Sequence, residues 1–234
     1  MIDLIKYTLQ DFFRSQKYFP PISTFIIVIF VFYTYTPNPV VDSYAVTALV
    51  VYVISAWISV SMLALDPPIQ RQLMILHIGS SYRYYLAKII SIWLISILLA
   101  IYAFVYPIIF NMFNESVTFT LGFMSILNHI LLATLGIMLA SLFSKGVMES
   151  TVNSYGGLAL ALILSIAAIG IQKLLPAPLE NMVWLLPPAL MTHVSLLDWT
   201  GESISQLEFI PFLWIFFYSL ILLVTFLSLS KQKA

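Results

Sequence analysis

Long apolar stretches, separated by short polar segments, run through nearly all of this 234-residue sequence. An α-helix needs about 20 mainly apolar residues to cross the hydrocarbon core of a bilayer. Six stretches approach or exceed that length: residues 19–36, 44–65, 86–113, 119–143, 152–175 and 210–229. Only 9% of the residues are charged, against about 25% in soluble domains, so a mostly hydrated surface is excluded. The sequence predicts an all-α integral membrane protein whose six transmembrane helices form one domain, residues 1–234.

The basic residues indicate how these helices are oriented. If the N-terminus is cytoplasmic, nine of the ten lysines and arginines lie on the cytoplasmic side, and Lys173 is the exception. Cytoplasmic loops of membrane proteins carry an excess of lysine and arginine. An even number of spans keeps the charges of both termini on that side. We therefore expect the N- and C-termini to be cytoplasmic.

Residues 1–18 have the pattern of an amphipathic helix. One side carries Ile2, Ile5, Leu9, Phe12 and Phe13, and the other carries Asp3, Lys6, Gln10, Arg14 and Lys17. A helix of this kind lies in the membrane interface with its apolar side in the lipid. Pro20 and Pro21 are expected to end it and turn the chain into the membrane. An ordinary core helix is the alternative.

Residues 176–209 are apolar in short pieces only. Pro187 and Pro188 interrupt them, so no piece is long enough to span. We expect an extracellular re-entrant segment, in which half-helices dip partway into the outer leaflet, with the prolines at its break. A disordered external loop is the alternative.

Residues suited to catalysis are missing from the sequence. It contains neither an H-E-x-x-H motif nor a G-x-x-x-x-G-K-[ST] phosphate loop, and it has no cysteine. Its three histidines, His77, His129 and His193, fall in three different predicted segments. We expect no catalytic residue, no metal site and no cofactor bound by this chain, so the chain by itself is not an enzyme.

Few polar residues occur in or beside the predicted spans. They are Asn128, His129, Glu149 and Asn153. Ionisable groups inside a membrane commonly mark a transport pathway, which would suit a channel or secondary transporter that works without a partner. Buried asparagine and histidine also form hydrogen bonds between packed helices, which is the simpler interpretation.

The polar loop after the second stretch predicts a short helix over residues 69–79. Its candidate contact residues are Gln70, Arg71, Leu73, Met74, Leu76 and His77. Gly79 can end the helix in a left-handed conformation, and Ser80 or Ser81 can cap the next one. A short amphipathic helix at a membrane surface is suited to dock into a groove of a soluble partner. An inert interfacial helix is the alternative.

The order of these segments resembles one family. An interfacial helix and two spans precede the loop helix, whose following residues include Gly79, Ser80, Ser81, Arg83 and Lys88. Two more spans, a broken outer segment with Leu186-Pro187-Pro188 and a final span follow. The sequence is similar to permease subunits of ABC-2-type exporters, in particular small peptide and toxin exporter permeases of Gram-positive bacteria.

This resemblance implies a bacterial plasma-membrane protein in which the loop helix is the coupling helix. It would contact a separate ATP-binding cassette ATPase subunit, which would bind the ATP and Mg²⁺. A second permease copy, identical or related, would complete the pathway, and nucleic acid is not an expected partner. Hydrophobic or amphipathic peptides are the implied cargo, with lipid-linked glycans or small antibiotics as alternatives.

Overall fold

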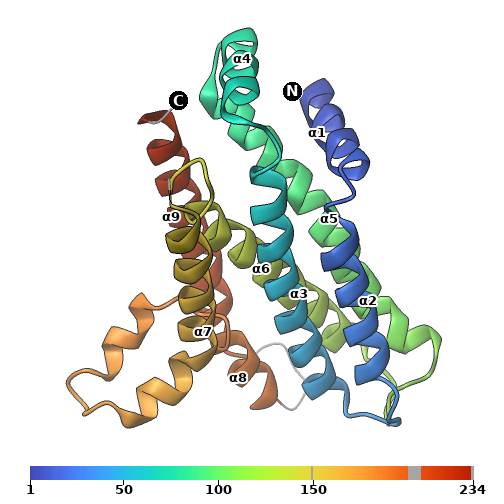
Figure 1. The fold of residues 1–234 in the computed structure, drawn as a ribbon. Helices are drawn as coiled ribbons and strands as arrows, with labels where there is room; N and C mark the ends of the chain where they lie inside the picture. Colours follow the sequence, from blue (N-terminus) through green and yellow to red (C-terminus); the bar gives the residue numbers. More distant parts are fainter. Residues whose placement is uncertain (149, 200–206, 233–234) are drawn as a thin grey trace.

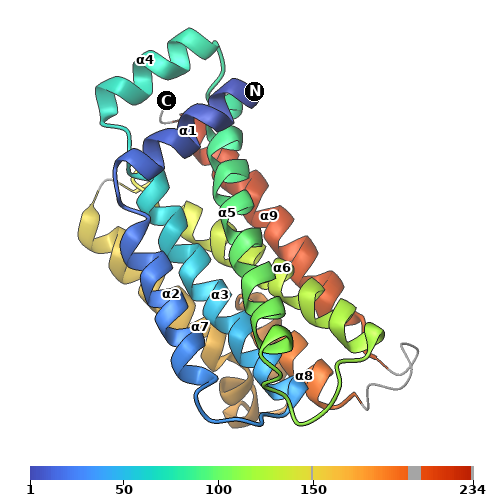
Figure 2. The same ribbon diagram turned by 90° about the vertical axis from the view of Figure 1, so that its right-hand side faces the viewer.

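The computed structural model describes residues 1–148, 150–199 and 207–232, and these residues form a helical bundle without a β-strand. Figures 1 and 2 show its helices from two sides. The helices are α1 (Ile2–Arg14), α2 (Phe19–Phe32), α3 (Val40–Leu63), α4 (Pro68–Ile78), α5 (Ser81–Ile109), α6 (Phe119–Leu142), α7 (Thr151–Leu174), the 3₁₀ helix η1 (Glu180–Leu185), α8 (Met191–Leu197) and α9 (Ile210–Gln232). The all-α prediction is therefore confirmed for the described residues.

Five of the described helices are long and apolar enough to cross a membrane: α3, α5, α6, α7 and α9. A sixth span exists if the bent pair formed by α1 and α2 is taken as one. A helix satisfies its own backbone hydrogen bonds, so apolar helices of this length are stable in lipid. The architecture fits an integral membrane protein.

The first predicted span differs from its helix in length. We expected residues 19–36, but α2 ends at Phe32 and has 14 residues. The prolines are also placed differently, because α1 already ends at Arg14 and Pro20 and Pro21 lie in the first turn of α2. Proline is tolerated there since the first N–H groups of a helix have no partner within it. The axes of α1 and α2 differ by 78°, so α1 lies across the bundle.

The centre of the bundle is the pair α3 and α6, which pack on each other more extensively than any other two helices. In each of these two helices, 67% of the 18-residue apolar stretch is buried, against 22% in α7 and 28% in α9. Gly136 allows this close contact. A Cβ atom at that position would lie 2.3 Å from the backbone oxygen of Tyr52.

The two ends of the bundle carry different structures (Figure 1). The α4 end, as we call it, holds α1, α4 and the last turns of α9. The α8 end holds α8 and the turns formed by residues 33–39 and 110–118. Helix α4 stands outside the bundle, between the spans α3 and α5 (Figure 2). The loop helix is therefore the element that projects farthest from the spans at this end.

Candidate functional site

Helix α4 is an 11-residue segment with a defined start and stop. Pro68 occupies its first turn, and Gly79 ends it with a φ of 71°, a left-handed conformation that glycine adopts without strain. Ser80 then caps α5, because its hydroxyl oxygen accepts a hydrogen bond from the N–H of Arg83 at 3.3 Å. The structured helix spans Pro68–Ile78, where the sequence suggested 69–79. Both of its ends are fixed by local sequence.

The outward side of α4 is apolar. Ile69, Leu73 and Leu76 recur at helical spacing, and their exposed fractions are 74%, 62% and 77%. His77 is exposed beside them. Exposed apolar side chains that form one stripe at a bundle end indicate a surface that another molecule covers.

Some of the contact residues that the sequence suggested lie on the inward side of α4 and others are exposed. Met74, Ile75 and Ile78 are partly buried and pack against the main hydrophobic core. Gln70 and Arg71 are half-buried. Leu73, Leu76 and His77 remain exposed, although Leu73 and His77 also border a cavity shared with α1.

An ion pair is buried at the base of α4. Lys88 Nζ lies 2.7 Å from Asp66 Oδ2, and the side chains of the two residues are 4% and 3% exposed. The Tyr84 hydroxyl donates a hydrogen bond to the same carboxylate oxygen. Lys88 Nζ also donates to the Met62 carbonyl at 3.3 Å and lies 5.2 Å from the centre of the Tyr84 ring. These contacts compensate the cost of removing two charges from water.

This ion pair joins the end of one span to the beginning of the next. Met62 is in α3, Asp66 precedes α4, and Tyr84 and Lys88 are in α5. Sequence reasoning missed the pair, although Asp66 follows the second predicted span and Lys88 begins the third. Consecutive spans joined by a short loop bring such ends together, and this was the available signal.

Helix α1 packs beside α4 and does not lie wholly in lipid. Phe12, which we expected on the lipid side, is fully buried, and Thr8 is 3% exposed; both lie in the helix that packs on α5. Gln70 Nε2 donates a hydrogen bond to the Tyr7 hydroxyl at 3.0 Å, which links α4 to α1. A cavity of about 530 Å³ between the two helices is lined by Met1, Asp3, Leu4, Tyr7, Gln70, Leu73, Met74, His77 and Ile78.

Of the polar residues expected in the spans, Asn128 and His129 are buried in α6. His129 Nδ1 lies 2.7 Å from the Ser125 carbonyl, which can only accept, so Nδ1 carries the proton. In the neutral ring Nε2 then accepts from the Thr47 hydroxyl of α3 at 3.0 Å. This geometry is that of a hydrogen bond between packed helices.

The other two polar candidates do not join this contact. Asn153 is exposed in the first turn of α7, where its backbone N–H donates to the Ser150 hydroxyl oxygen. Glu149 lies outside the described residues. The four residues therefore do not form a common site in the part of the chain that the structure describes.

The prolines at which we expected the break of residues 176–209 lie between η1 and α8. Pro187 is also a contact point, because its carbonyl accepts a hydrogen bond from the Ser165 hydroxyl of α7 at 2.8 Å. Pro188 follows it, and α8 begins at Met191. The break that the sequence places at Pro187 and Pro188 is thus held against a long helix.

A metal site is not evident among the described residues. No three histidine, aspartate or glutamate side chains there gather closely enough to hold a metal ion. The α4 surface is therefore the candidate functional site, and it is a surface for contact with another molecule. Comparison of the chain with protein-family models, with curated proteins and with solved structures finds no match.

Proposed function

We propose that this chain is the permease subunit of an ATP-driven exporter of the ABC-2 type, with α4 as the coupling helix. The carrying observation is that α4 presents an exposed apolar side while its base is held by the buried pair of Asp66 and Lys88. A helix that transmits force from a partner must be accessible on one side and firmly attached on the other. Helix α4 meets both conditions.

The proposed partner is a separate ATP-binding cassette ATPase, which would hold ATP and Mg²⁺. In this assignment the α4 end is cytoplasmic, in accord with the concentration of lysine and arginine there, and the membrane is a bacterial plasma membrane. The permease itself would carry out no chemical step. Movement of α4 would reach α3 and α5 through the Asp66–Lys88 contact.

A second permease copy would complete the translocation pathway, either identical or related. Support comes from α7 and α9. Most of the apolar stretch of each helix is not covered by the described part of the chain. Lipid covers some of this surface and a second copy would cover another part. The proposed cargo is a hydrophobic or amphipathic peptide; lipid-linked glycans and small antibiotics are the alternatives.

The test is co-purification of the permease with its ATPase. The double variant Leu73→Asp/Leu76→Asp places two charges on the exposed side of α4, and we expect it to abolish the complex. Gln72→Asp is the matched control, since it adds a charge to an exposed position of the same helix outside the stripe. Both variants should elute as monodisperse permease when expressed alone. Retention of the complex by the double variant would rule out the coupling role.

The competing function is a channel or secondary transporter that needs no partner. Asn128 favours it, because its Oδ1 atom is buried and has no hydrogen-bond partner within the described part of the chain. The permease reconstituted alone should then carry flux under an ion gradient. Flux that requires both the ATPase and ATP would remove this alternative.

A further inference from the structure

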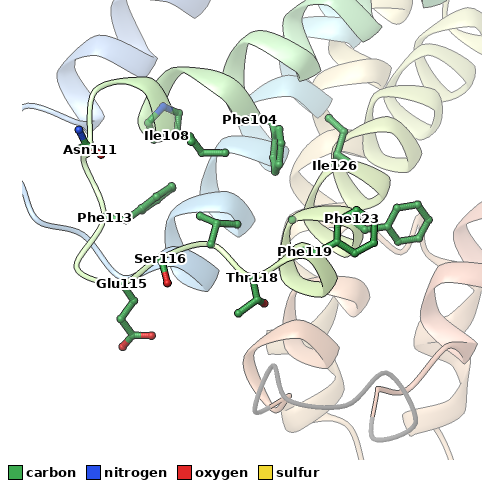
Figure 3. Close-up of a pocket in the computed structure, with 13 residues that line it drawn as sticks. Phe104, Ile108, Asn111, Phe113, Glu115, Ser116, Thr118, Phe119, Phe123 and Ile126 are labelled. Carbon is green, nitrogen blue, oxygen red and sulfur yellow. The ribbon is translucent and has the colours of Figure 1, made fainter.

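A large cavity in the described structure lies at the α8 end, away from α4. It has a volume of about 710 Å³ and opens between the end of α5, residues 110–118 and the start of α6. Its walls are mainly aromatic and aliphatic: Phe104, Phe113, Phe119, Phe123, Ile108 and Ile126. Figure 3 shows the Phe104 and Phe113 rings within it, with the Glu115 carboxylate at its solvent edge. A volume of this size is typical of sites for small ligands.

The backbone around this cavity is fixed. The N–H of Asn38 donates to the Met112 carbonyl at 2.9 Å, and the N–H of Asn114 donates to the Asn38 carbonyl at 3.0 Å. The Tyr44 hydroxyl donates to the Phe104 carbonyl at 3.0 Å, and the two rings are stacked. The rim and one wall are therefore held in place by other elements, which lowers the entropic cost of binding a ligand.

The charge around the cavity is negative. A second cavity on the other side of residues 114–118 includes Asp42 and shares Glu115 with the first. No lysine or arginine lines either cavity. Among the described residues of the α8 end the acidic side chains are Asp42, Glu115, Glu180, Asp198 and Glu208, and the basic one is Lys173.

Histidine does not offset this charge. His193, in α8, is partly buried, which lowers its pKa, and the nearby Asp42 carboxylate only partly counteracts that shift. A neutral imidazole at pH 7 leaves the acidic excess intact. The excess of acidic side chains at the α8 end is also not needed to orient the protein in the membrane. Orientation depends on lysine and arginine, and acidic residues contribute little.

We propose that this cavity binds a cationic amphipathic peptide. Apolar side chains of the peptide would occupy the aromatic walls, while one ammonium or guanidinium group would pair with Glu115 at one side of the rim and another would face the ring of Phe119 at the other side. Cation–π contacts and opposite charges act together in such a site. The carboxylates disfavour anionic lipid headgroups in the same place. The inference rests on the proposed function, of which it specifies the cargo class.

The absence of cysteine from the chain allows a direct test. Ser116→Cys places a single thiol at the exposed rim of the cavity, and Ala177→Cys places a matched control thiol at an exposed position of the same end. The rate of maleimide labelling is measured in phosphatidylcholine nanodiscs without ATPase. The probes are a 14-residue amphipathic peptide of lysine and leucine and its glutamate–leucine counterpart.

We expect the lysine–leucine peptide to slow labelling at Ser116→Cys at least fivefold and to leave the control unchanged. Glu115→Gln should raise the half-protecting concentration about fivefold and Phe119→Ala about threefold, which are the effects of a partly exposed ion pair and a cation–π contact. Both side chains are exposed, so these variants should fold normally.

Two results would overturn the proposal. One is equal protection by the cationic and acidic peptides, which would indicate a purely apolar site of the kind an acyl chain fills. The other is an unchanged half-protecting concentration in Glu115→Gln. Because the ATPase is absent from this experiment, its failure would leave the α4 association intact, and loss of that association would leave protection intact.

Discussion

Among the buried polar contacts that link α3 to neighbouring helices, two differ in charge. At the α4 end, Asp66 and Lys88 form an ion pair 2.7 Å long where α3 and α5 are joined through α4. Farther along α3, Thr47 meets His129 of α6 through a neutral hydrogen bond of 3.0 Å. Charge is costly within a bilayer and less so near its surface. The α4 end is therefore built around a charged joint, and the Thr47–His129 contact between α3 and α6 is neutral.

The largest expected effect comes from breaking the charged joint. Lys88→Met leaves the buried Asp66 carboxylate without its counter-ion, which should lower the free energy of unfolding by about 3–5 kcal/mol. The measurement is unfolding of the purified protein in mixed micelles, followed by circular dichroism. Lys145→Met is the matched control, because Lys145 is exposed.

The double variant Asp66→Asn/Lys88→Met separates charge from packing. Removing both charges should recover most of the stability, because a missing pair is far less costly than an unpaired charge. If the double variant is as unstable as the single one, the joint depends on shape and not on charge.

The close packing of α3 and α6 at Gly136 can be disrupted sterically. Gly136→Ala introduces a Cβ atom 2.3 Å from the Tyr52 oxygen, and the backbone cannot move away without separating the helices. We expect a loss of about 1–3 kcal/mol, as for overpacked cores. Gly156→Ala is the control on α7, where a Cβ would meet nothing within 4 Å. It should be neutral or stabilise by up to about 1 kcal/mol, because alanine favours helices; equal losses in both variants would contradict the close approach.

Part of this fold can be predicted from the sequence alone. The long apolar helices follow from bilayer thickness and composition, and Gly79 and Ser80 mark helix ends through their own backbone chemistry. These features are local. Local features of this kind predict α4 and its apolar side without knowledge of the tertiary contacts.

Other features depend on which helices become neighbours. Phe12 is fully buried because α1 packs on α5, and an amphipathic pattern alone does not distinguish lipid from a protein surface as the apolar partner. Asp66 and Lys88 are 22 positions apart, and their pairing depends on the angle between two spans.

A smaller effect is expected at the end of α4. Gly79→Ala forces a side chain into a left-handed conformation, at a cost of about 1–2 kcal/mol, although open space surrounds the position. We expect the loss to weaken binding of the ATPase about tenfold in pull-down titrations, because α4 loses its defined end. Gly79→Asn is the conservative control, since asparagine tolerates this conformation better. Equal effects of alanine and asparagine would show that the backbone conformation of residue 79 is not what matters.

The smallest expected effect tests the neutral side of the comparison. Thr47→Val removes the hydroxyl that donates to His129 Nε2 and leaves that nitrogen without its partner. Hydrogen bonds between membrane helices contribute about 0.6 kcal/mol on average, so the loss should be near that value. A double-mutant cycle with His129→Leu isolates the coupling, and Thr225→Val is the control, because Thr225 is exposed and bonds only within its own helix. A coupling of about 3 kcal/mol would exceed what a neutral hydrogen bond between membrane helices contributes, and the contrast between a charged joint and a neutral contact would no longer hold.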